Sequence, residues 1–184
     1  MTSKFRPVVH ASVLLIPFLV EATSKPTVLV ALVATTLVYV LSEALRLNGK
    51  QVPLITRFTL AMSRDNESLR FVVAPLYLAL GVILSLLFFP KNIAYASMTI
   101  TAVGDPMASW VGNRFGRMRV ERKTLEGFAA GLLVSFATAL LWVPPYLALM
   151  GSLAGMLLEL LEFLDDNLTI PIGAGLAMLI TSIL

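Results

Sequence analysis

Residues 71–90, FVVAPLYLALGVILSLLFFP, decide the class of this protein, because twenty successive residues carry no charged side chain. A helix of about 20 apolar residues is long enough to cross the hydrocarbon core of a bilayer. The composition agrees, since 58% of the 184 residues are hydrophobic and 14% are charged, against roughly 25% charged residues in an average soluble domain. We therefore predict an all-α, polytopic membrane helical bundle.

Apolar stretches on both sides of that run predict about seven transmembrane helices. They cover residues 7–20, 26–45, 71–90, 92–111, 125–143, 145–163 and 168–184, and the first and last are shorter than a bilayer needs. Residues 48–70 alternate polar and apolar side chains, which favours an amphipathic segment lying in the membrane interface. Because no linker or low-complexity tract divides the chain, residues 1–184 are expected to form a single integral-membrane domain.

Cysteine is absent and His10 is the only histidine. Disulfides, thiolate nucleophiles, cysteine-ligated metals and multi-histidine metal sites are therefore excluded. Lys4 and Arg6 precede the first apolar run, but no convincing cleavage site follows them, so we expect this segment to be retained.

The lysines and arginines predict an orientation, because these residues favour the cytoplasmic side of a membrane. With seven alternating spans, all of the 14 except Lys25 and Lys91 fall on one face. We therefore predict that the N-terminus is cytoplasmic. The polar groups of residues 104–131 and 159–171 fall on the same face, which predicts an active or binding site at the cytoplasmic surface.

The sequence TAVGDPMASWVGNRFGRMRVERKTLEG at residues 101–127 places Asp105 inside a predicted span. An ionised carboxylate there costs about 2.5 to 3.5 kcal/mol on insertion scales, so Asp105 needs a partner or a metal. Pro106 predicts a break in the helix. A kinked span in which Asp105 pairs with an arginine for packing remains the alternative.

Glycines and cations follow Asp105. Gly112 and Gly116 suit close approach of backbone amides to a phosphate, whereas Gly127 and Gly131 equally suit close helix packing. Arg117 and Lys123 belong to a basic run that would also anchor the chain at the membrane. Thr124 is predicted to cap the next helix, which puts Glu126 in its first turn, where its carboxylate is also a candidate Mg²⁺ ligand.

A second acidic group, in LLELLEFLDDNLTIP, includes Glu159, Asp166 and Asn167. We expect this acidic group to face the basic run across the bundle. Its carboxylates would then bind Mg²⁺ while the cations bind phosphate oxygens, which are the two requirements of phosphoryl transfer. A helix cap by Asp166 or Asn167 remains the alternative for this group. Two further polar sets remain open: Arg6 with His10 on one helical face, and Glu43 with Arg46, which are spaced to pair with each other.

The segments GDPMASWVGNRFGR, KTLEGFAAG and DDNLTIP, with RPVVH and SEALR before them, resemble in order and spacing the polyprenol kinase family, which includes dolichol kinase, phytol kinase and CTP-dependent diacylglycerol kinase. The resemblance implies a kinase that phosphorylates the hydroxyl of a dolichol- or polyprenol-type lipid, or of a diacyl- or dialkylglycerol, with CTP and Mg²⁺ or another divalent cation. One departure is that Pro7 follows Arg6, where the family often has Arg-Lys.

The resemblance is carried over residue by residue, and the roles given to these residues are our hypothesis. Catalytic roles fall on Asp105, Lys123, Glu126 and Asp166; metal binding falls on Asp105, Glu126 and Glu159; nucleotide or phosphate binding falls on Arg6, Gly104, Gly112, Gly116, Arg117, Lys123, Thr124, Gly127 and Asn167; His10, Glu43 and Arg46 match without an assigned role.

Two other functions remain open. A membrane cytidylyltransferase that makes a CDP-lipid would use similar residues, and a small transporter or lipid-binding protein would instead place polar residues near the bilayer midplane. Lipid, nucleotide and bilayer are the expected partners and no nucleic acid is expected, while the glycine spacing is compatible with a homodimer.

Overall fold

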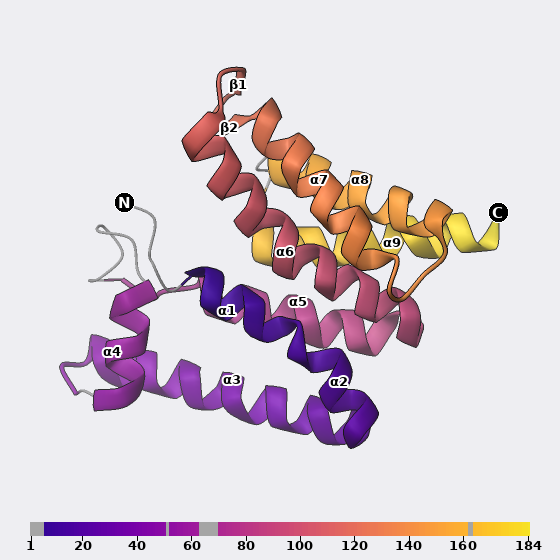
Figure 1. The fold of residues 1–184 in the computed structure, drawn as a ribbon. Helices are drawn as coiled ribbons and strands as arrows, with labels where there is room; N and C mark the ends of the chain where they lie inside the picture. The colour runs from indigo at the N-terminus through magenta and orange to yellow at the C-terminus, as the bar shows by residue number, and fades with distance from the viewer. Residues whose placement is uncertain (1–5, 51, 63–69, 162–163) are drawn as a thin grey trace.

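The computed structural model describes residues 6–50, 52–62, 70–161 and 164–184, and these residues are mostly helical (Figure 1). The helices are α1 (Arg6–Val13), α2 (Leu15–Ala22), α3 (Lys25–Leu47), α4 (Pro53–Met62), α5 (Ala74–Phe88), α6 (Lys91–Phe115), α7 (Leu125–Ala139), α8 (Pro145–Leu161) and α9 (Asp166–Ile183). A short antiparallel hairpin of β1 (Arg119–Val120) and β2 (Lys123–Thr124) joins α6 to α7.

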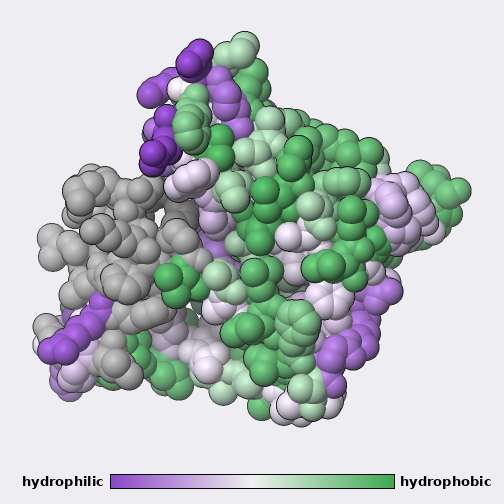
Figure 2. Space-filling model, viewed as in Figure 1, coloured by the Kyte–Doolittle hydropathy of each residue, from purple (hydrophilic) through white to green (hydrophobic). Residues whose placement is uncertain are grey.

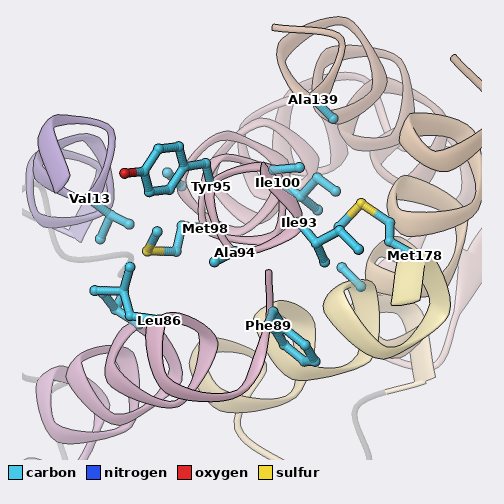
Figure 3. Close-up of a cluster of buried hydrophobic side chains, with 14 of the residues drawn as sticks. Val13, Leu86, Phe89, Ile93, Ala94, Tyr95, Met98, Ile100, Ala139 and Met178 are labelled. Carbon is cyan, nitrogen blue, oxygen red and sulfur yellow. The ribbon is translucent and has the colours of Figure 1, made fainter. Parts of the chain in front are cut away.

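Helix α6 is the centre of the bundle, because α1, α5, α7, α8 and α9 all pack against it. Its residues 93–102 are all buried. Figure 3 shows Tyr95, Met98 and Ile100 of α6 among side chains of neighbouring elements, which include Val13, Leu86, Ala139 and Met178 from helices and Phe89, which follows α5. A helix buried on every side over this length is stabilised by packing against its neighbours rather than by one amphipathic face. The hydroxyls of Ser97, Thr99 and Thr101 donate to backbone carbonyls of the same helix.

Glycine allows α6 and α7 to pack closely. A Cβ at Gly127 would lie 2.5 Å from the carbonyl oxygen of Ala108, and one at Gly131 would lie 3.0 Å from that of Gly104. The backbones of the two helices therefore approach to a distance that larger residues do not allow. This contact fixes where α6 ends and α7 begins, and so positions the hairpin between them.

The predicted apolar stretches correspond to the helices, with two differences at prolines. Residues 7–20 form two helices, because Pro17 has no N–H to donate to the carbonyl of Val13, and the break falls at Leu14. The break predicted at Pro106 is wrong, since α6 continues through Pro106 to Phe115. A proline removes one helical hydrogen bond, and the neighbouring helices hold α6 in place.

Two helices, Lys25–Leu47 and Asp166–Ile183, are long and apolar enough to cross a membrane by length and composition, and four shorter apolar helices accompany them. The expected number of about seven spans is not confirmed by this criterion. In the predicted interfacial segment 48–70, the structure has helix α4, while residues 51 and 63–69 lie outside the described part of the chain.

Among the residues coloured in Figure 2, hydrophobic ones predominate over the centre and right of the face, and hydrophilic residues gather at its upper edge over the hairpin, with smaller hydrophilic patches at the lower left and lower right. Helix α3 has a mostly exposed surface that includes Val30, Val33, Leu37, Val38 and Leu41. Only 17% of the most apolar 18-residue stretch of this helix is buried in the bundle. An exposed apolar surface of this extent favours contact with lipid.

Candidate active site

Three carboxylates from distant parts of the sequence meet at one end of the bundle. Asp105 comes from α6, Glu159 from the last turn of α8 and Asp166 from the first residue of α9. Ligand oxygens of the three residues all lie within 4.8 Å of one another. Asp105 is 2% and Glu159 1% exposed. We call these three residues the acidic trio.

Lys123 of the hairpin reaches into the acidic trio. Its Nζ donates to Asp166 Oδ2 at 3.0 Å and makes a close salt bridge with Glu159 Oε1. Its side chain is 16% exposed. Burial by itself lowers the pKa of Lys123, but the negative charges of Asp166, Glu159 and Asp105 outweigh it and raise the pKa above the ordinary value. Lys123 is therefore a cation throughout the physiological pH range.

A pocket of ≈ 340 Å³ opens beside the acidic trio. The trio and Lys123 form one side of it, and the hairpin contributes Arg119 and Arg122. The small residues Gly112 and Gly116 line it as well. The pocket thus combines carboxylates, which suit a hard divalent cation, with guanidinium groups, which suit phosphate oxygens.

His10 contacts Asp105 from helix α1. Its Nε2 lies 3.6 Å from Asp105 Oδ2, and its Nδ1 lies 3.3 Å from the carbonyl oxygen of Thr101. The carbonyl can only accept, so Nδ1 carries the proton in this hydrogen bond. His10, which the sequence left without a role, therefore lies at the site, whereas the side chain of Arg6 lies outside the described structure.

The predicted phosphate-binding glycines divide into two groups. Gly112, Gly116 and Gly127 line the pocket, and a Cβ on any of them would approach Thr124 to 3.0 Å or less. Gly104 does not line the pocket, and a Cβ there would meet Ser135 Oγ at 2.5 Å and Met156 Sδ at 2.7 Å. Packing thus accounts for Gly104, while the other three serve both the helix contact and the pocket wall.

Thr124 caps α7 as predicted, since its Oγ1 accepts from the backbone N–H of Gly127 at 3.1 Å. Glu126 lies in the first turn of α7, but its carboxylate accepts from the backbone N–H of Met118 at 3.1 and 3.3 Å. The structure brings Asp166, rather than the predicted ligand Glu126, together with Asp105 and Glu159.

The cap of α9 is Asp165, whose side chain accepts from Asn167 N at 3.0 Å, rather than Asp166 or Asn167. The Asp166 carboxylate is therefore not needed for the cap and belongs to the acidic trio. Asn167 is 2% exposed, its Nδ2 donates to the carbonyl of Ala74 at 3.4 Å, and its Oδ1 has no hydrogen-bond partner among the described residues. Asn167 therefore ties the start of α9 to the start of α5.

Glu43 and Arg46 pair through two hydrogen bonds of 2.8 Å, and neither lines the pocket. Arg46 also donates to the carbonyl of Arg70 at 2.6 Å, and Glu43 accepts from the N–H of Val72 at 3.1 Å. The pair thus holds the chain entering α5 against the end of α3.

Six pocket residues were not assigned from the sequence: Ala108, Ser109, Asn113, Arg119, Arg122 and Phe128. Ser109 and Asn113 follow Asp105 at steps of four residues, so helical periodicity was an available signal. Arg119 and Arg122 belong to the basic run in which Arg117 was selected instead, and Arg117 does not line the pocket. The conformation of the hairpin, which the sequence did not predict, determines which of these cations line the pocket.

The donors of the acidic trio fit a divalent cation such as Mg²⁺, because all are carboxylate oxygens close enough to share one ion. The residues that would hold it are Asp105, Glu159 and Asp166. Their combined charge is only partly offset by Lys123, which leaves the group with a net negative charge.

Part of this chain is similar to a known protein. The chain is 26% identical over 136 residues to a Glycine max protein named probable phytol kinase 1, chloroplastic. The match supports a distant relationship to the polyprenol and phytol kinases. It covers 61% of this chain and 45% of that protein, so this chain corresponds to less than half of its relative. No family model matches the chain, and no solved structure gives a significant match.

Proposed function

We propose that this protein is an integral-membrane lipid kinase that transfers a phosphoryl group from a nucleoside triphosphate to the hydroxyl of a membrane lipid alcohol. The observation that carries the proposal is the acidic trio beside a pocket lined by Lys123, Arg119 and Arg122. The relationship to a protein named a phytol kinase supports the same reaction class.

The pocket offers a separate group for each part of the donor. Asp105, Glu159 and Asp166 would hold the divalent ion, which would neutralise charge on the donor phosphates. Arg119 and Arg122 would bind phosphate oxygens, and Gly112 and Gly116 would let the donor approach the backbone of α6 closely. The donor is proposed to be CTP and the ion Mg²⁺.

In the transfer, the lipid hydroxyl oxygen forms a bond to the γ-phosphorus while the bond from that phosphorus to the β-γ bridging oxygen breaks. CDP leaves with the electron pair, and a carboxylate of Asp166 or Glu159 takes the hydroxyl proton. The acceptor is proposed to be a dolichol- or polyprenol-type alcohol, or a diacyl- or dialkylglycerol, with its hydroxyl at the cytoplasmic interface. We expect a multi-pass topology with a cytoplasmic N-terminus.

A product assay tests this function. Purified protein in detergent, with Mg²⁺ and CTP labelled at the γ-phosphate, is given polyprenols, phytol and diacyl- or dialkylglycerols, with ATP in parallel. We expect label to enter an organic-phase lipid as CDP forms. Pyrophosphate release with a phosphorylated lipid would instead identify a cytidylyltransferase, and no turnover by folded protein with any pair would favour a transport or lipid-binding role.

A further inference from the structure

The position of the Lys123 ammonium suggests a role beyond phosphate binding. Nζ contacts carboxylates of both Glu159 and Asp166, two of the three residues whose oxygens lie within 4.8 Å of one another. An ammonium held among carboxylates neutralises the same charge that a bound metal ion would neutralise. Lys123 and a divalent ion therefore compete for the same oxygens.

We propose that Lys123 is an internal placeholder for the divalent cation, and that a metal ion entering the acidic trio displaces its ammonium toward the phosphate-binding side of the pocket. The inference rests on the proposed function for its physiological meaning, but the competition itself is a property of metal binding alone. Lys123 lines the same pocket as Arg119 and Arg122, so the displaced ammonium has phosphate oxygens of the donor as its next partners.

Two features of the structure favour this exchange over a permanent ion pair. The hairpin that carries Lys123 consists of two strands of two residues each, so movement of its side chain disturbs little regular structure. The carboxylates, in contrast, come from the long helices α6, α8 and α9, which are held by the core. The cation is thus the movable partner, and the trio is the fixed one.

The placeholder has a consequence for the order of events. With Lys123 in place, two carboxylates already share a cation, so the free ion binds weakly. A metal ion that arrives with a nucleotide brings phosphates that accept the released ammonium, which favours the complex over the bare ion. Divalent ion and nucleotide should therefore bind with positive coupling.

His10 allows the test to be read directly. It is the only histidine in the chain, and its Nε2 lies 3.6 Å from Asp105 Oδ2. In detergent-solubilised protein labelled with ¹⁵N-histidine, the paramagnetic ion Mn²⁺ should broaden the His10 signals when it occupies the trio. The measurement is the Mn²⁺ concentration at half-broadening, for wild type and for Lys123→Met.

If Lys123 competes with the ion, Lys123→Met lowers that concentration by about tenfold or more, because a cation in contact with two carboxylates is removed. Arg119→Met is the matched control, because it removes a positive charge from the same pocket. The expected change is less than about threefold, since the ion pairs of Glu159 and Asp166 in the described part of the chain are made with Lys123. Lys123→Arg, which keeps the charge, is expected to stay within a few-fold of wild type.

Equal or weaker Mn²⁺ binding by folded Lys123→Met overturns the inference, as does an equal gain in Arg119→Met. Should Lys123→Met fail to fold without metal, the wild-type protein still decides the matter. Adding CTP must then lower the half-broadening concentration in wild type, and the absence of any shift counts against the placeholder. The two proposals can fail separately. If the enzyme transfers phosphate but Lys123 and the ion do not compete, the proposed function stands and the placeholder is wrong. If they compete but no phosphate is transferred, the placeholder stands and the proposed function is wrong.

Discussion

Asp105 contacts residues from two parts of the bundle. His10 approaches it from α1, while Glu159 and Asp166 complete the acidic trio. Burial of an ionised carboxylate is costly without partners. His10, the Ser109 hydroxyl at 3.5 Å and the Lys123 cation offset this cost for Asp105, whereas the negative charges of Glu159 and Asp166 add to it. Asp105 is therefore the residue through which the N-terminal helix, the central helix and the pocket are connected.

Replacing Asp105 by Asn removes the negative charge but keeps the shape of the side chain. We expect Asp105→Asn to lower phosphoryl transfer by on the order of 10²-fold or more, because one preorganised charge of the site is lost. The matched control is Asp165→Asn, which makes the same change at the α9 cap, where Asn also caps well. Comparable losses in both variants, or full activity in Asp105→Asn, would remove Asp105 from the mechanism.

The membership of the site was only partly predictable from residue types. The sequence identified Asp105, Lys123, Glu159 and Asp166, because charged groups beside apolar spans require an explanation. As metal ligands it selected Glu126 with Asp105 and Glu159, whereas the structure groups Asp166 with these two residues. Two hydrogen bonds that the sequence does not reveal account for the difference. The Met118 N–H donates to the Glu126 carboxylate, and Asp165 rather than Asp166 caps α9.

At the scale of elements, long apolar runs predicted the helices well, because burial and lipid contact both demand them. The hairpin was not predicted. Its strands are two residues long, and its turn, Glu121–Arg122, lacks the Asn-Gly signal although Glu121 has a φ of 51°. The predicted break at Pro106 failed because packing around α6 outweighs one missing hydrogen bond.

The contact between α6 and α7 gives a prediction about stability. Gly127→Ala places a Cβ 2.5 Å from the backbone oxygen of Ala108, so the two helices must separate. We expect a loss of about 1–3 kcal/mol, the usual cost of overpacking, measured as a lower midpoint of thermal unfolding in detergent.

Gly155→Ala provides a graded comparison, because its Cβ would meet only side-chain methyl groups of Ile100, Ile170 and Ala174 at 3.1–3.5 Å. Side chains yield more readily than backbone, so this variant should unfold at a midpoint closer to wild type. Equal midpoints for both variants would show that the close backbone approach at Gly127 does not limit stability. The separation of α6 and α7 should also displace the hairpin and weaken nucleotide binding in Gly127→Ala.

For the molecule as a whole, the two ends of α3 distinguish the two faces of the bundle. Arg46, near its C-terminal end, donates to the carbonyl of Arg70, and Asn167, beside Asp166, donates to the carbonyl of Ala74. The end of α3 and the pocket therefore lie on one face, and Lys25 begins α3 at the other. If α3 crosses the membrane, its orientation fixes the side on which the pocket opens.

Because the chain has no cysteine, single cysteines at exposed Lys25 and Lys50 can report that orientation. We expect a membrane-impermeant maleimide to label Lys25→Cys in intact cells and Lys50→Cys only in inverted vesicles, as the excess of positive charge at the Lys50 face requires. Labelling of both from one side would show that α3 does not span the membrane. A reversed pattern would turn the pocket away from the cytoplasm, where nucleoside triphosphates are available, and would therefore count against the kinase reaction as well as against the orientation.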